Sequence, residues 1–294
     1  MQGHPMHFDS RWQRWLLLMP AATLLLLLTL YPIGQMLLYS FSKVDYAASR
    51  SWVGLENYRQ LFADWFFTTS LKNTLLFSFG SSLLQVLLGL ALALLLYRHF
   101  PGRQWVLSLL IYPMMISTLV CSAIWRVWFH YDFGLLNNCL TALGLMPQPW
   151  LSSPHLALWS LMLVDIWQWT PMACLVILAG LQAIPKDVLE AAQSDGANGW
   201  KRLWYVTLPL IRQPLMLALL LRSIDTFKLF DKVYALTGGG PGYATETLSL
   251  YIYQQGFKFF NLGLASAGAV IMLLFAAAMS LVYAWQLLRG GKTA

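Results

Sequence analysis

The chain has 294 residues, of which 58% are hydrophobic and only 11% are charged. That composition excludes a water-soluble globular protein, because such a domain carries many more charged residues. The formal net charge of +7 does not indicate nucleic-acid binding, since the cations stand in loops beside apolar segments of membrane-spanning length. We therefore expect an all-α, polytopic membrane protein that forms one domain.

Six apolar segments predict six transmembrane helices, because each has about the twenty apolar residues that a helix needs to cross a bilayer. Gly80 and Gly89 in the second segment, and Gly263 and Gly268 in the sixth, are expected to let helices approach one another closely. The expected spans lie within 15–41, 71–96, 105–128, 156–180, 210–236 and 262–288.

Residues 1–14 form a polar, basic tail, and residues 15–290 form the six-helix domain. The first apolar segment is too long for the core of a signal peptide, so we expect it to stay as an uncleaved span.

The distribution of lysine and arginine predicts the orientation in the membrane. Four cations stand in the loops of one side, at Lys43, Arg50, Arg59 and Lys258. Ten stand on the other side, at Arg11, Arg14, Arg98, Arg103, Lys186, Lys201, Arg202, Arg212, Arg289 and Lys292. Both termini are therefore expected in the cytoplasm of a bacterial inner membrane, and the loops 42–70, 131–155 and 238–260 outside it.

The polar segment 185–209 separates the fourth and fifth spans, yet its interior is typical of a helix. Pro185 stands where a first-turn proline is tolerated, and Asp187 complements the positive helix end. Gly196 and Gly199 then interrupt the helix. The apolar side chains form a stripe made of Val188, Leu189, Ala191 and Ala192. An amphipathic helix in such a loop indicates docking on a partner, or a helix that lies on the membrane surface.

These residues resemble a known family. Glu190-Ala191-Ala192, then Gly196, then 206–209 (Val-Thr-Leu-Pro) are similar to the EAA signature of membrane subunits of binding-protein-dependent ABC importers, although Val206 replaces the usual isoleucine. The segments 183–185 and 236–241 resemble the carbohydrate-uptake branch of that family, which includes maltose and glycerol-phosphate transporters. The resemblance covers roughly residues 15–290.

The resemblance implies the fold of a type I ABC importer permease, with a cytoplasmic coupling helix between the fourth and fifth transmembrane helices. The residues that would couple to a separate ATPase are Glu190, Ala191, Ala192, Gly196, Leu208 and Pro209. The implied partners are a second permease subunit in a heterodimer, two ATPase subunits and a periplasmic or extracellular sugar-binding protein. ATP and Mg²⁺ would bind the ATPase, so no cofactor is expected on this chain, and no nucleic acid.

Polar side chains inside the fourth and fifth spans are candidates for substrate contacts, because such residues are costly in a membrane. Helical spacing puts those of the fourth span on one face, and those of the fifth span repeat the pattern. The candidates are Asp165, Gln168, Trp169, Met172, Arg222, Asp225, Thr226 and Leu229. An indole ring beside amides and carboxylates suits a sugar. By the resemblance, the maltose transporter's membrane subunit contacts sugar at these positions, Asp225 excepted.

An alternative is that Asp165, Arg222 and Asp225 only neutralise one another within the bundle. Lys228, Asp231 and Lys232 approach the outer end of the fifth span, so we expect them at the interface and outside the site.

The sequence predicts no chemistry of its own for this chain. The nearest match to a phosphate-binding loop is 291–293 (Gly-Lys-Thr), which lacks the first glycine and follows a membrane helix. His4 and His7 have no further partners for a metal, and the three cysteines lie far apart. We therefore predict a non-catalytic permease subunit of an ATP-driven importer for a sugar or polyol. The alternative is an ion-coupled secondary sugar transporter, with Asp165, Asp225 and Arg222 as an ion relay.

Overall fold

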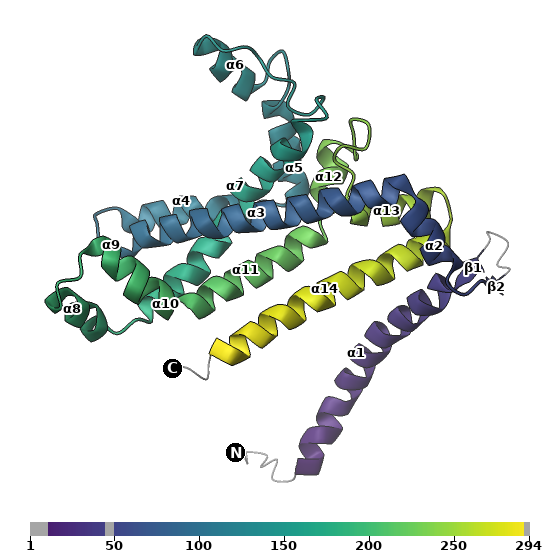
Figure 1. The fold of residues 1–294 in the computed structure, drawn as a ribbon, viewed down its shortest axis with the longest axis horizontal. Helices are drawn as coiled ribbons and strands as arrows, with labels where there is room; N and C mark the ends of the chain where they lie inside the picture. The colour runs from purple at the N-terminus through teal and green to yellow at the C-terminus, as the bar shows by residue number, and fades with distance from the viewer. Residues whose placement is uncertain (1–10, 45–49, 291–294) are drawn as a thin grey trace, which may run out of the picture.

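The computed structural model describes residues 11–44 and 50–290, and over these residues the chain is a bundle of helices with one short hairpin (Figure 1). The expectations for His4, His7 and 291–293 lie outside the described residues.

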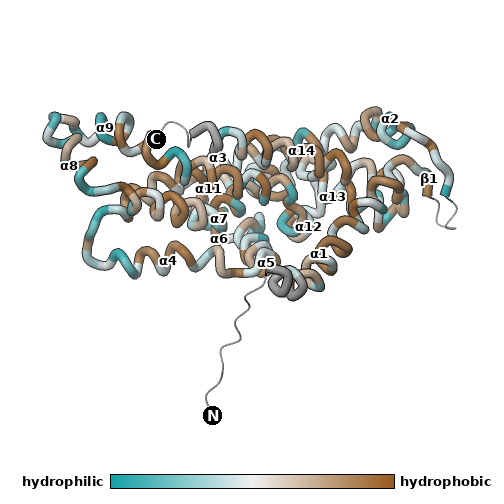
Figure 2. The backbone as a smooth tube through the Cα atoms, turned by 90° about the horizontal axis from the view of Figure 1, so that it is seen from below, coloured by the Kyte–Doolittle hydropathy of each residue, from teal (hydrophilic) through white to brown (hydrophobic). Residues whose placement is uncertain are grey.

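In chain order the elements are α1 (Arg11–Ser40), β1 (Ser42–Val44), β2 (Arg50–Trp52), α2 (Glu56–Ala63), α3 (Trp65–Tyr97), α4 (Arg103–Met115), α5 (Thr118–Trp128), α6 (Leu135–Ala142), α7 (Ala157–Gln182), α8 (Lys186–Ser194), α9 (Gly199–Arg202), the π-helical turn η1 (Leu203–Thr207), α10 (Leu208–Leu210), α11 (Arg212–Phe227), α12 (Asp231–Leu236), α13 (Leu248–Tyr253), the π-helical turn η2 (Gln254–Lys258) and α14 (Leu262–Gly290). The helices α8 and α9 lie at one end of the bundle, and α2 with the hairpin lies at the other (Figures 1 and 2). The helix α1 meets the bundle near the start of α14 and diverges from there (Figure 1).

Among the described residues, four helices are long and apolar enough to cross a membrane, namely α1, α3, α7 and α14. Two bent helix pairs also qualify if each pair counts as one span, which raises the number to six. Hydrophobic residues follow one another along α1, α3 and α4, whereas hydrophilic residues gather around α8 and α9 (Figure 2). The expected spans 15–41, 71–96, 156–180 and 262–288 therefore fall on continuous helices, while the other two need correction.

The expected continuous helix over 105–128 is wrong, because the chain turns by 97° between α4 and α5. Pro113 lies in the last turn of α4, where its ring and its missing N–H disrupt the helix. Ile116 and Ser117 adopt extended backbone angles. The freed carbonyl of Ile116 accepts a hydrogen bond of 2.9 Å from Gln168 of α7, so the break is stabilised from the neighbouring helix.

The expected continuous helix over 210–236 is also wrong. The helix α11 ends at Phe227, and α12 starts afresh at Asp231 after a short irregular segment. At its other end, α11 bends by 66° from the segment Gly199–Leu210. A run of apolar residues gives no sign of these bends, since it predicts membrane burial but not a straight axis.

Glycines let α3 and α7 pack closely, as the sequence predicts. A Cβ atom on Gly89 would lie 2.9 Å from both the Ala173 Cβ and the Cys174 backbone nitrogen of α7. A Cβ on Gly80 would overlap the end of the Met162 side chain. Because lipid tails are as apolar as leucine, van der Waals packing of this kind, rather than the hydrophobic effect, holds helices together in a membrane.

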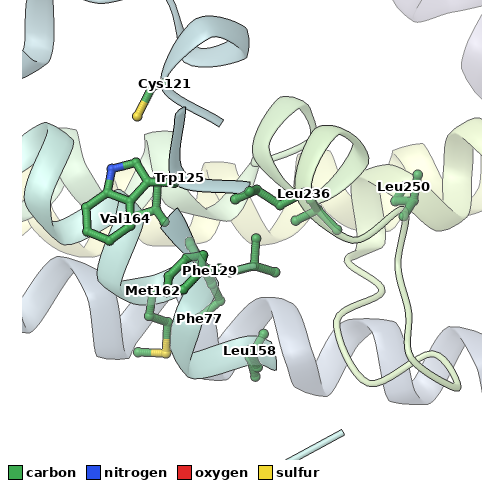
Figure 3. Packing of buried hydrophobic residues seen from close by; sticks show 11 residues of the cluster. Phe77, Cys121, Trp125, Phe129, Leu158, Met162, Val164, Leu236 and Leu250 are labelled. Carbon is green, nitrogen blue, oxygen red and sulfur yellow. The ribbon is translucent and has the colours of Figure 1, made fainter. Parts of the chain in front are cut away.

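One apolar cluster joins the bent helices to the bundle (Figure 3). Phe77 of α3, Trp125 of α5 and Met162 of α7 pack there with Leu236 of α12 and Leu250 of α13. Trp125 also contacts Trp167 with ring centroids 5.6 Å apart. The cluster fixes α5 and α12 beside α7, which is where the polar site lies.

The hairpin of β1 and β2 is a small departure from the expected all-α fold. The strands are antiparallel, with Ser42 opposite Trp52. Asn57 of α2 donates hydrogen bonds of 2.9 Å to the carbonyl oxygens of Ser40 and Ser42, which ties the hairpin to the end of α1. The expected outer loop 42–70 is thus structured over 42–44 and 50–70, the residues that the structure describes.

Candidate functional site

Asp165 of α7 and Arg222 of α11 form an ion pair inside the bundle. The Arg222 Nη2 atom lies 3.4 Å from Asp165 Oδ2, and the two side chains are 2% and 1% exposed. The polar faces that the sequence places on the fourth and fifth spans therefore meet. Removing an ion from water costs several kcal/mol, so such a pair needs further polar partners.

Lys232 is one of those partners, and its expected place at the membrane interface is wrong. Its side chain is fully buried, and Nζ pairs with Asp165 Oδ1. The irregular segment after α11 lets α12 turn back, and the amine then reaches α7. Counting residues along an assumed straight helix puts Lys232 at the outer end, which is why sequence reasoning misses it.

Gln85 of α3 is a second polar partner of the ion pair, and it is not among the residues that the sequence predicts for the site. Its Nε2 donates to Asp165 Oδ2 at 2.7 Å, and its Oε1 accepts from Arg222 Nε at 2.6 Å. Gln85 follows Ser78 and Ser82 at helical spacing, so the polar face of α3 is visible in the sequence. Ser78 Oγ of α3 lies 3.0 Å from Thr226 Oγ1 of α11, so a second polar contact links α3 to α11.

A cavity of about 260 Å³ opens beside this network. The Trp169 ring covers the Arg222 guanidinium, whose Cζ lies 4.9 Å from the ring centroid, a cation–π contact. Asp225 is partly exposed and pairs with Lys228 at 3.1 Å. The cavity lining consists of Thr118, Asp165, Trp169, Arg222, Asp225, Lys228, Leu229, Phe230, Asp231 and Lys232. The expectation that Lys228 and Asp231 lie outside the site is therefore also wrong.

The eight predicted substrate residues do not all reach this cavity. Asp165, Trp169, Arg222, Asp225 and Leu229 line it. The other three lie elsewhere. Gln168 turns toward the break between α4 and α5, Thr226 bonds to α3, and Met172 is half-buried away from the lining.

The charges around the cavity balance. Three carboxylates line it, at Asp165, Asp225 and Asp231, and three cations line it, at Arg222, Lys228 and Lys232. The site therefore offers many hydrogen-bonding groups and one indole face without a net charge.

The segment 185–209 forms a helix–turn–helix at the end of the bundle (Figure 1). Gly196 follows α8 with φ +78°, a left-handed conformation that glycine adopts readily and that strains most other residues. Asn198 caps α9 by accepting a hydrogen bond of 2.9 Å from the Lys201 backbone N–H. Glu190 and Ala191 of α8 are exposed, and Ala192 is half-buried.

Leu208 and Pro209 lie in α10, directly before α11. Leu189 of α8 packs against the apolar cluster that contains Leu181 and Ile211. Leu189 thus attaches α8 to the bundle, while the neighbouring Glu190 is exposed.

A buried carboxylate lies in the loop before α13. Glu246 is 1% exposed, and its Oε2 atom has no hydrogen-bond partner among the described residues. Burial and the nearby Asp64 carboxylate raise the pKa of Glu246 to about 7. Asp64 itself accepts a hydrogen bond of 2.6 Å from the Tyr251 hydroxyl.

Comparison with characterised proteins places this arrangement in a family. The chain is 37% identical over 261 residues to the trehalose/maltose transport system permease protein MalF of Thermococcus litoralis, covering 88% of this chain and 87% of that protein. It is 36% identical over 286 residues to the sulfoquinovosyl glycerol transport system permease protein SmoG of Agrobacterium fabrum, covering 93% of this chain and 92% of that protein.

The fold matches that of a solved transporter. A chain in the crystal structure of a bacterial alginate ABC transporter, in complex with an alginate pentasaccharide-bound periplasmic protein, superposes with a TM-score of 0.82. The identity is 23%, and the match covers 92% of each chain. Residues 85–289 match the family described as binding-protein-dependent transport system inner membrane component. The chain is therefore a member of that family, a non-catalytic membrane component of an ABC transporter.

Proposed function

We propose that this chain is the permease subunit of an ATP-driven importer that carries a sugar or polyol across the bacterial inner membrane. The observation that carries the proposal is the exposed helix–turn–helix of α8 and α9 in a chain of this family. A separate ATPase would grip this element and supply the energy, with ATP and Mg²⁺ bound to that partner alone.

In this proposal α8 is the coupling helix. Glu190 offers a carboxylate to the ATPase surface, and Ala191 and Ala192 keep that surface flat enough for close docking. Gly196 supplies the turn between the two short helices, and Leu208 and Pro209 carry the movement into α11. Because α11 holds Arg222, a shift of α8 would reach the cavity directly.

The remaining partners follow from the same family. We propose a second permease subunit in a heterodimer, two ATPase subunits and a sugar-binding protein outside the membrane. The alginate transporter was solved with a periplasmic protein, which supports the last of these. Both termini and α8 would lie in the cytoplasm, in agreement with the excess of lysine and arginine on that side. The chain would cross the membrane six times, with α4 and α5 together in the third span and α11 in the fifth.

The substrate class rests on two observations. Relatives at 36–37% identity are permeases for trehalose or maltose and for sulfoquinovosyl glycerol. The cavity beside Trp169 has balanced charges and many hydrogen-bonding groups. We therefore propose a sugar or polyol, bound by Asp165, Trp169, Arg222, Asp225 and Leu229. No observation favours the ion-coupled secondary transporter.

Substitution of Gly196 tests the coupling role. A Cβ atom at Gly196 would meet nothing within 4 Å among the described residues, so within this chain Gly196→Val acts through backbone strain. Gly196→Asn is the conservative variant, because asparagine tolerates a positive φ. Gly102 has φ +84° and equally open space outside the segment 185–209, so Gly102→Val is the matched control.

The measurements are sugar uptake and ATP hydrolysis by the assembled complex in proteoliposomes. We expect Gly196→Val to abolish uptake and the stimulation of ATP hydrolysis by loaded binding protein, while Gly196→Asn and Gly102→Val retain both. Normal uptake by Gly196→Val would overturn the coupling role. Uptake that continues without ATP and stops with an uncoupler would overturn the proposal as a whole.

A further inference from the structure

A basic hollow lies between the bundle and the helices α8 and α9. Its volume is about 730 Å³, and its wall is formed by the ends of α3 and α7, the start of α4, and α8, α9 and η1. Four cations line it, at Arg98, Arg103, Lys186 and Arg202, together with His99. Among the described residues, no carboxylate lines it.

These cations are not neutralised within the part of the chain that the structure describes. The ion pairs found over 11–44 and 50–290 all involve Asp165 or Asp225. Arg103 donates a hydrogen bond of 2.6 Å from Nε to the Leu96 carbonyl, which fixes its guanidinium at the hollow. Like charges gathered around one space repel one another, so an anion between them is stabilised.

An apolar groove of about 580 Å³ lies on α3, α4 and α7, which also form part of the wall of the hollow. Its lining is Leu88, Ala91, Leu92, Leu95, Leu109, Leu110, Pro113, Ile166, Trp167, Thr170 and Pro171. Leu95 of the groove adjoins Leu94 of the hollow along α3. Along α4 the groove begins at Leu109, about 9 Å from Arg103 at 1.5 Å per residue. The basic hollow and the apolar groove are therefore two ends of one surface.

We propose that the hollow and the groove together bind one anionic glycerophospholipid of the membrane. The phosphate lies among Arg98, Lys186 and Arg202, and an acyl chain runs between α3 and α4. Leu95 and Leu109 of the groove are 59% and 73% exposed, so an acyl chain can lie along them. A lipid with a neutral headgroup would leave the cations unmatched. The assignment to the cytoplasmic leaflet rests on the proposed topology.

The lipid would link α8 and α9 to the ends of α3 and α4, so the headgroup touches the proposed coupling element from its membrane side. Basic pockets between transmembrane helices at the cytoplasmic side are a known setting for acidic headgroups. This role concerns lipid binding and is separate from the transported substrate.

Native mass spectrometry of the detergent-purified complex, titrated with phosphatidylglycerol or phosphatidylcholine, tests the proposal. We expect tight binding of phosphatidylglycerol and weak binding of phosphatidylcholine. The double variant Arg98→Gln, Arg202→Gln should weaken phosphatidylglycerol binding by about thirtyfold, since each basic residue near a membrane surface contributes about 1 kcal/mol. Lys201→Gln with Arg212→Gln removes the same charge from exposed positions outside the hollow and should leave binding unchanged.

The acyl chain is tested separately. Ala91→Trp fills the groove without changing charge, and it should weaken binding of long-chain phosphatidylglycerol. Inorganic phosphate should not displace the lipid. Equal binding of the two lipids, equal losses in the two double variants, or displacement by phosphate would each overturn the proposal. If a variant does not assemble, the proposal is decided by comparing the binding of phosphatidylglycerol and phosphatidylcholine to the unmodified complex. Because transport is not a readout, failure here is distinct from failure of the importer assignment.

Discussion

The ammonium group of Lys232 pairs with the Asp165 carboxylate in the interior of the bundle, across 67 positions of the chain. Asp165 also accepts from Gln85 and lies 3.4 Å from Arg222, so one carboxylate joins α3, α7, α11 and α12. Because each of these helices contributes one group, a rearrangement of any helix changes the partners of Asp165. This property suits a protein that alternates between two access states.

Replacing Lys232 with methionine should destabilise the complex by about 3 kcal/mol, since Asp165 then loses its closest cation while it stays buried. Lys228→Met is the control, because Lys228 is 61% exposed and its ion pair with Asp225 contributes little. Thermal unfolding of the purified complex measures both. The double variant Lys232→Met, Asp165→Asn should recover part of the lost stability, because the buried carboxylate is then absent as well. A double-mutant cycle of the two residues measures this coupling. Equal melting temperatures for the two single variants would contradict this account.

The sequence predicts much of this site, and the exceptions have one physical origin. Asp165, Arg222 and Asp225 stand out because charged residues are rare inside apolar segments, and helical spacing correctly places them on facing surfaces. Lys232 is missed because an apolar run does not reveal that α11 stops at Phe227. Gln168 is misplaced for a similar reason, since the broken turn at Ile116 that binds it is invisible in the pattern.

Gln85 was within reach of sequence reasoning. It follows Ser78 and Ser82 on one face of a span that is otherwise apolar, and that pattern alone marks a polar contact surface. The close approaches at Gly80 and Gly89 were predicted from the same helix and are confirmed. The bends could not be predicted, because proline is tolerated in membrane helices when neighbouring groups satisfy the freed carbonyls.

Trp169→Ala should weaken apparent affinity for the transported sugar. An aromatic contact contributes about 0.5–1.5 kcal/mol beyond its buried area, so the KM of uptake should rise up to about tenfold. Trp169→Phe keeps an aromatic face and should retain most of the affinity. Trp159 lies in the same helix, is 54% exposed and does not line the cavity, so Trp159→Ala serves as the control. Equal KM values for Trp169→Ala and Trp159→Ala would exclude the indole as a ligand.

Glu246 should make the stability of the complex depend on pH. Burial and the Asp64 carboxylate raise the pKa of this carboxyl from its ordinary value of 4.5 to about 7. The folded state therefore holds the proton more tightly than the unfolded state. The contribution of Glu246 to the free energy of unfolding is fully present below the pKa that this carboxyl has in the unfolded chain. It is lost as the pH rises through about 7, the pKa in the folded protein. We expect the melting temperature to fall across that window.

Glu246→Gln should remove this part of the pH dependence, because the amide has no proton to lose in that range. Glu56, an exposed residue of α2, gives the control Glu56→Gln. Melting curves of the three complexes between about pH 5 and 8 provide the measurement. A wild-type slope that persists in Glu246→Gln would show that another group is responsible.

Gly89→Ala should weaken the packing of α3 on α7. The added Cβ lies 2.9 Å from the Ala173 Cβ and from the Cys174 backbone nitrogen, and neither atom is the flexible end of a long side chain. The helices must separate, which costs about 1–3 kcal/mol for an overpacked contact. A Cβ atom on Gly34 of α1 would meet nothing within 4 Å in the part of the chain that the structure describes. Gly34→Ala therefore adds the same methyl group without a clash and should be neutral or slightly stabilising. Thermal unfolding separates the two variants, and an unchanged melting temperature for Gly89→Ala would mean that the α3–α7 contact yields easily. In that case the polar groups around Asp165, rather than close packing, would hold α3 in place.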